Sequence, residues 1–243
     1  MKPDTSILPK LWLLPDSIRN RLGREPGPQR AMFEDGHLLI ILHQIPGADE
    51  HKRKPALFWR NPDGEWKTNL PGSGLAGLND HLRSFDTKLT ELEEEENRAR
   101  MATEYHEVLE KLAPVLRTSR GLHRALQQAR ELVKSERELI NMRDQAAGIE
   151  RNADLLLQDA QFGLNFTVAR QAEAQAASAR QMASTAHRLN LLAAMFLPLT
   201  ALASIFGMDF HSGMADTPAN FWLVCASGLL LGMVVMGMLG KRH

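Results

Sequence analysis

Asp209 is the residue whose type and position in this chain most suggest chemistry with an ion. It follows an apolar run, residues 189–208, in which three side chains are polar, and it lies in the stretch PLTALASIFGMDF, residues 198–210. Its carboxylate has two explanations. Asp209 is either a loop residue that water solvates or a residue that binds a cation. The elements that place Asp209 decide between these explanations.

A helix through the apolar run has two unlike sides. At about 100° per residue, a sector of roughly 100° collects mostly small or hydroxylated residues. Its members are Ala179, Ala183, Ala186, Asn190, Ala193, Leu197, Thr200 and Ser204. The opposite side carries Leu192, Met195, Phe196, Leu199, Leu202 and Phe206. Small residues let two helices pack closely, whereas oxygens that face a water-filled path replace part of a cation's hydration shell. We favour the path because the stripe continues below the apolar run and Asp209 stands at its outer end.

Leu197 and Pro198 give this stripe a candidate gate. Leu197 is its bulkiest member, so a ring of Leu197 side chains from several copies would form an apolar constriction that closes by dewetting. Pro198 has no N–H to donate and leaves the Ala194 carbonyl free, so we expect the helix to bend there.

Two apolar segments are long enough to cross a membrane. Residues 189–208 and 219–240 contain no charged side chain, and twenty helical residues span roughly 30 Å, the thickness of the hydrocarbon core. Arginines precede the first segment, while Lys241 and Arg242 follow the second. The positive-inside rule therefore places both termini in the cytoplasm and the loop 209–218 in the periplasm. We expect a multi-pass protein of the cytoplasmic (inner) membrane; the alternative is a buried helical hairpin in a soluble core.

The rest of the chain is expected to form a cytosolic body. Residues 1–77 read as a small β-containing part, with a buried strand at 37–45 and a hairpin at 56–69 around the turn NPDG. Residues 78–188 read as a helical domain and stalk. We expect breaks near Pro114, Arg120–Gly121 and Gly148, and then one long helix from near Arg151 to Phe206. The predicted fold class is thus a mainly α membrane protein with a small N-terminal α/β domain.

An acidic run marks the first part of this helical body. The stretch LTELEEEENRAR contains Glu91, Glu93, Glu94, Glu95 and Glu96. Such a run is usually a solvated helix face, and weak binding of a hard cation such as Mg²⁺, with a regulatory role, is the alternative.

Composition and motifs exclude several other classes. Lysine plus arginine and aspartate plus glutamate both number 29, so no basic field favours nucleic acid. The single cysteine, Cys225, excludes a disulfide within one chain. The sequence has no HExxH, nucleophile elbow or P-loop, and its nine histidines lack ligand spacing, so an enzyme is not expected. Helical pattern follows the glycines at 72, 74 and 77, which favours a helix-capping loop over a dinucleotide site.

The C-terminal quarter resembles a known family. The segment LNLLAAMFLPLTALASIFGMDF, with a short loop and a second span led by Phe221 and Trp222, is similar to CorA-type divalent metal ion transporters, the two-span GxN group. The resemblance implies a homopentameric funnel whose first span lines the pore. It also implies an outer signature that receives hydrated Mg²⁺, and gating by cytosolic metal between subunits. Gly207 and Met208 match the signature, but its final asparagine is replaced by Asp209.

The expected function is passive transport of Mg²⁺ or of Zn²⁺, Co²⁺ or Ni²⁺. Five copies of Asp209 would place up to five negative charges in one ring, which should attract cations more strongly than asparagines and hold them longer. We expect no cofactor other than the transported or regulatory ion, and partners limited to copies of this chain and membrane lipid, with no nucleic acid. The alternative is a non-conducting, membrane-anchored scaffold or regulatory protein with the same frame.

Overall fold

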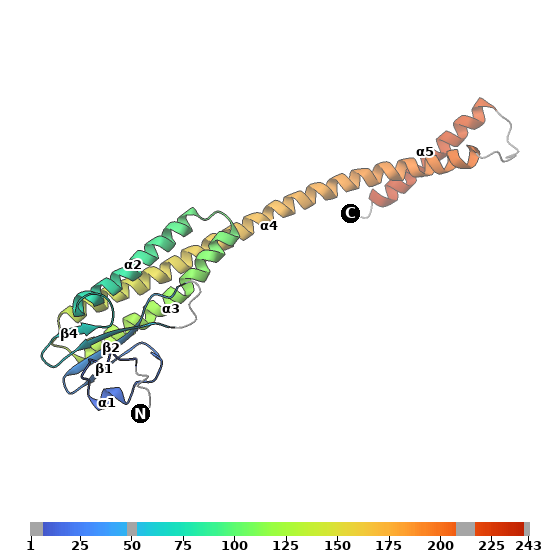
Figure 1. Cartoon of the computed structure of the whole chain (residues 1–243). Coiled ribbons are helices and arrows are strands. Elements are labelled where there is room, and N and C mark those ends of the chain that lie inside the picture. The colour runs from blue at the N-terminus through green and yellow to red at the C-terminus, as the bar shows by residue number, and fades with distance from the viewer. Residues whose placement is uncertain (1–6, 48–52, 208–216, 241–243) are drawn as a thin grey trace. The chain divides into compact units, whose positions relative to one another are not determined.

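The computed structural model describes residues 7–47, 53–207 and 217–240. The chain divides into two compact units, Met1–Ala169 and Arg170–His243. The elements are α1 (Asp16–Arg19), β1 (Arg30–Glu34), β2 (His37–His43), β3 (Pro55–Arg60), β4 (Trp66–Thr68), α2 (Gly74–Arg98), α3 (Ala102–Leu132), α4 (Glu138–Gly207) and α5 (Pro218–Gly240). The expected mainly helical organisation with a small N-terminal sheet is confirmed (Figure 1).

The four strands form an antiparallel meander in the order β1-β2-β3-β4. Ile40 of β2 lies opposite Phe58 of β3, and Phe58 lies opposite Thr68 of β4. The predicted strand at 37–45 and the hairpin around NPDG are confirmed. Strand β1 was not predicted, because its five residues, RAMFE, carry too short an alternation of apolar and polar side chains.

Strand β2 is buried on both faces, which explains its continuous apolar sequence. Leu38, Ile40 and Leu42 belong to the core beneath the helices. Leu39 and Ile41 belong to a second cluster on the other face. That cluster is completed by Trp12, Leu14, Ile18, Met32, Leu57 and Trp59, so the N-terminal segment with α1 covers the outer face of the sheet.

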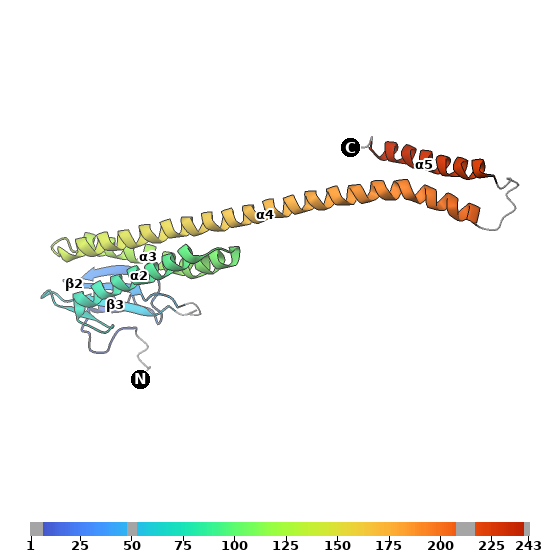
Figure 2. The ribbon, with the colours of Figure 1, turned by 90° about the horizontal axis from the view of Figure 1, so that it is seen from above.

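Helices α2, α3 and the first part of α4 lie side by side over the inner face (Figures 1 and 2). The expected breaks at Pro114, Gly121 and Gly148 are wrong, because α3 and α4 run through all three positions. Pro114 removes a single helical hydrogen bond, to the Glu110 carbonyl. Buried apolar residues on both sides of it hold α3 together: Val108, Leu112, Val115, Leu116, Leu122, Ala125, Leu126 and Ala129.

The glycine-rich stretch leads into α2, as expected. Gly74 has a φ of 30° and contacts Trp66 of β4, and a Cβ at this position would collide with the Trp66 backbone. The glycine therefore serves the packing of α2 on the edge strand.

In the second unit, α5 runs antiparallel along the end of α4 (Figure 2). A Cβ added at Gly232 of α5 would lie 3.1 Å from the carbonyl oxygen of Met195, so the two backbones approach closely there. Helix α4 starts at Glu138, earlier than the expected Arg151, and ends at Gly207. Among the residues that the structure describes, no helix is long and apolar enough to cross a membrane. The two spans therefore stay a prediction.

Candidate functional site

The predicted stripe lies on α4, and its side chains are exposed. This holds for all seven residues that were predicted to line a pore: Ala183, Ala186, Asn190, Ala193, Leu197, Thr200 and Ser204. Leu197, the candidate gate, is 67% exposed. Among the residues that the structure describes, no element of this chain covers the stripe.

Helix α5 packs on a different side of α4. The residues of α4 with reduced exposure near this contact are Leu191, Ala194, Met195 and Pro198. Met195, which meets Gly232, lies almost opposite the middle of the stripe at about 100° per residue. The small-residue stripe is therefore not the seam between the two helices of the hairpin.

Thr200 shows how the stripe could present oxygen to an ion. Its hydroxyl donates a hydrogen bond of 2.8 Å to the carbonyl of Phe196, one turn earlier. A hydroxyl has one donor and two lone pairs, so the bond to the backbone leaves the oxygen free to accept. Helix α4 bends in its final turns, the part that contains Pro198 (Figure 2).

The outer signature is described only in part. Gly207 is the last residue of α4. Met208 and Asp209 lie outside the described residues, so the predicted cation ring at Asp209 stays a prediction.

Within the described part of the chain, three carboxylates of the acidic run form ion pairs, whereas Glu93 and Glu96 form none. Glu91 forms an ion pair with Lys88 at 2.9 Å, and Glu95 one with Lys111 of α3 at 2.6 Å. Glu94 lies 3.7 Å from Arg98. These three carboxylates therefore form the solvated, ion-paired face that the run predicted.

Glu93 and Glu96 instead line a groove of about 660 Å³ together with Asp86 and Asp159. Partial burial, then the charges of Asp159 and Glu93, raise the pKa of Glu96, which Arg100 partly opposes. Within the described part of the chain, no group of three or more His, Cys, Asp or Glu residues is arranged to hold a metal ion. A regulatory role for the acidic run stays a prediction.

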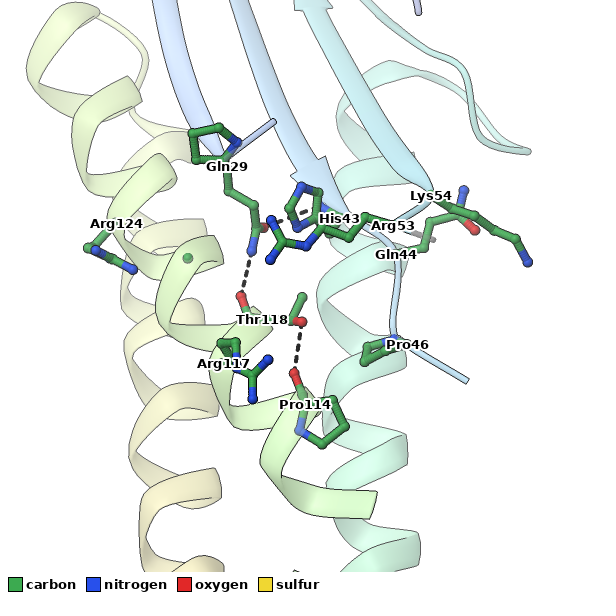
Figure 3. Close-up of a pocket in the computed structure, with 12 residues that line it drawn as sticks. Gln29, His43, Gln44, Pro46, Arg53, Lys54, Pro114, Arg117, Thr118 and Arg124 are labelled. Carbon is green, nitrogen blue, oxygen red and sulfur yellow. Dashed lines mark hydrogen bonds between the residues drawn. The ribbon is translucent and has the colours of Figure 1, made fainter. Parts of the chain in front are cut away.

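A basic cavity in the first unit escaped the sequence analysis. It measures about 360 Å³ and lies between the end of β2 and the middle of α3, and Arg53, Lys54, Arg117 and Arg124 line it (Figure 3). Its lining residues are spread from position 28 to position 124. No local motif connects them, so only the fold could show that they meet.

The chain is similar to a known family and to solved structures. The family model described as "CorA-like Mg2+ transporter protein" matches residues 75–242. The complete structure of the CorA magnesium transporter from Methanocaldococcus jannaschii is similar at 16% identity, covering 90% of this chain and 80% of the other, with a TM-score of 0.39. The full-length CmaX protein is similar at 14% identity, covering 88% and 77%, with a TM-score of 0.45. No curated protein matches the chain.

Proposed function

Because the chain belongs to the CorA-like Mg²⁺ transporter family, whose model matches residues 75–242, we propose that it carries divalent metal cations across the cytoplasmic membrane. The cargo is Mg²⁺ or a transition ion such as Zn²⁺, Co²⁺ or Ni²⁺. Residues 189–208 and 219–240 form the two spans, and both termini face the cytoplasm. The protein is a transporter and not an enzyme.

The uncovered stripe on α4 is the observation that carries this proposal. Helix α5 occupies another side of α4, so the stripe is available to face copies of itself. Five copies around an axis would enclose a path lined by Asn190, Thr200 and Ser204. Their oxygens stand in for part of the ion's water shell. Rings of Ala183, Ala186 and Ala193 leave the path wide, and the ring of Leu197 narrows it.

Asp209 sets which ions enter, in this proposal. A ring of carboxylates attracts divalent cations more strongly than a ring of amides, but release is also required for conduction. Mg²⁺ sheds its water reluctantly. The ring therefore favours ions that dehydrate more readily than Mg²⁺.

Ion flux into liposomes tests the proposal. Purified wild-type protein, Asp209→Asn and the matched loop variant Asp216→Asn are compared for uptake of Mg²⁺, Co²⁺ and Ni²⁺. We expect uptake by all three proteins, with Asp209→Asn alone shifted towards Mg²⁺. Equal selectivity in the three proteins would contradict the role of Asp209, and absence of uptake in all of them would contradict transport.

A further inference from the structure

The basic cavity in the first unit has the size of a small-molecule site. Its volume of about 360 Å³ falls within the range of roughly 300–1,000 Å³ that ligand pockets occupy. Arg53 comes from the segment before β3, and Arg117 and Arg124 come from α3, so arginines line the cavity from two separate parts of the chain (Figure 3).

The arginines around the cavity differ from other arginines of the same unit. Arg60 pairs with Glu136 at 2.9 Å, and Arg120, between the two cavity arginines of α3, pairs with Asp154 at 2.7 Å. Within residues 7–47, 53–207 and 217–240, the three cavity arginines form no such ion pair, and the cavity lining contains no carboxylate. Three guanidinium groups therefore line one cavity, and no carboxylate of the described residues pairs with them.

The back wall of the cavity is held by hydrogen bonds from Gln29. Its side-chain oxygen accepts a bond of 3.2 Å from the backbone N–H of His43, and its amide nitrogen donates one of 2.8 Å to the carbonyl of Thr118 (Figure 3). The same side chain lies against Gly121, where an added Cβ would collide with it. The end of β2 and the middle of α3 are thus fixed to each other at the cavity.

His43 lies in the wall of the cavity. The side chain is buried, and its Nε2 lies 2.8 Å from the carbonyl oxygen of Gly27. Burial lowers the pKa of His43, the bond to Gly27 opposes this, and the charge of Arg53 lowers the pKa further. An anion in the cavity would offset that charge.

We propose that this cavity binds a phosphate-bearing small anion. The guanidinium group of arginine presents a planar fork of donors that matches two phosphate oxygens. Three arginines around one cavity suit a ligand with several phosphate charges better than a single monovalent anion. The proposal is independent of the transport of metal ions, since it uses none of the α4 stripe.

Calorimetric titration of the full-length protein in detergent, with inorganic tripolyphosphate as the probe, tests this site. We expect one saturable site per chain. Each arginine would supply charge-assisted hydrogen bonds to phosphate oxygens, so Arg117→Gln and Arg124→Gln should each weaken binding roughly tenfold or more. Arg117→Lys keeps the charge but lacks the planar fork of donors, so its affinity should lie between those of Arg117→Gln and the wild type. Arg151→Gln, an exposed arginine of α4 away from the cavity, is the matched control and should bind as the wild type does.

A second titration with water-soluble dihexanoyl phosphatidic acid distinguishes a free phosphate compound from a lipid headgroup. Tighter binding of tripolyphosphate assigns a soluble ligand, and tighter binding of the lipid assigns a headgroup; either result, with the loss in Arg117→Gln, supports the site. Absence of binding to the wild type overturns the proposal. So does an equal loss in Arg151→Gln and Arg117→Gln, or full binding by folded Arg117→Gln.

Discussion

Helix α4 has a different surrounding in each of the two units, although it is one helix. In the first unit, buried residues recur every three or four positions: Leu139, Met142, Ala146, Ile149, Ala153, Leu156 and Ala160. In the second unit the apolar side chains are largely exposed; Phe196 of α4 is 53% exposed and Trp222 of α5 is 70% exposed. Exposed apolar surface on this scale marks contact with a membrane or with other chains. The first part of α4 therefore completes a core within one chain, whereas the last part leaves apolar side chains exposed in one chain.

The largest expected effect is a loss of stability from a core substitution in the first unit, compared with an exposed position in the second unit. Phe58 is fully buried under α2 and α3. Phe58→Ala should lower the free energy of unfolding by about 3–5 kcal/mol, through lost burial and the cavity left behind. Phe196→Ala, the control, should change it by about 0.5 kcal/mol or less, as for other exposed positions. Chemical denaturation of the full chain in detergent measures both. Similar losses in the two variants would mean that the second unit has its own buried core within one chain.

The pH dependence of stability should come from the first unit. His81 is buried against the rings of Phe58 and Phe85, and its Nε2 has no hydrogen-bond partner among the described residues. Burial lowers the pKa of His81 to about 4, although a backbone hydrogen bond to His43 opposes this. At a pH between the pKa of the unfolded chain, near 6.5, and this pKa of the folded chain, the unfolded chain binds more protons at His81 than the folded chain does. The stabilisation is therefore fully present above pH 6.5 and is lost as the pH falls towards 4.

The size of this loss follows from the pKa difference. About 2.5 units at 1.36 kcal/mol each correspond to about 3 kcal/mol. Denaturation of the wild type between pH 7.5 and pH 4 should show this slope. His81→Phe should flatten it, and His106→Gln, at an exposed position of α3, should keep it. An unchanged slope in His81→Phe would contradict the assignment.

Two glycines of α5 test whether this helix packs on α4 in the second unit. Gly232 meets the Met195 backbone, whereas nothing lies within 4 Å of a Cβ added at Gly237. Alanine is better than glycine in a helix by roughly 1 kcal/mol, so Gly237→Ala should stabilise the chain by about that amount. Gly232→Ala should lose this gain, because its Cβ would push α5 away from α4. Thermal unfolding in detergent compares the two variants. An equal gain in both would show that α5 does not pack on α4 through Gly232.

The smallest effects are expected on the acidic face of α2. Glu93 and Glu96 are like charges three residues apart beside the groove, and such pairs destabilise a helix by about 0.2–0.5 kcal/mol. The pKa of Glu96 is raised in the folded chain. The folded chain therefore loses stability as the pH rises above the usual pKa of a glutamate side chain, because the unfolded chain releases this proton first. Glu96→Gln should therefore stabilise the chain by a few tenths of a kcal/mol at neutral pH.

Glu94→Gln is the matched control for this prediction. It removes a pair with Arg98 and should destabilise the chain by a similar few tenths of a kcal/mol. Denaturation midpoints measured in parallel show whether each variant is more or less stable than the wild type. A change in the same direction in both variants would contradict the division of the acidic run into ion-paired carboxylates and carboxylates that line the groove.

Local patterns in the sequence predicted several elements. A continuous apolar run predicted β2, the turn residues NPDG predicted the hairpin, and a helical repeat of small residues predicted the stripe of α4. Strand β1 was too short for such a pattern. Pro114 and Gly148 look like helix breakers locally, but tertiary packing overrides that preference.

Features made by distant residues could not be read from the sequence. The partner of Glu95 is Lys111 on the next helix, so the run EEEE alone did not show which of its carboxylates are neutralised. The basic cavity joins Arg53 to Arg117 and Arg124 only after β2 and α3 have packed. Local spacing shows which face of an element is apolar, and it does not show which charged groups of other elements lie beside that face.

One measurement tests most directly whether the stripe lines a shared path. On a Cys225→Ser background, Ala193→Cys places a thiol on the stripe, and Leu192→Cys places one at nearly the same depth on the opposite side. Divalent-ion flux into liposomes is recorded before and after a charged, water-soluble thiol reagent is added. The account predicts that the reagent blocks flux through Ala193→Cys and leaves Leu192→Cys unchanged. Block of Leu192→Cys alone, or an equal response of both variants, would contradict it.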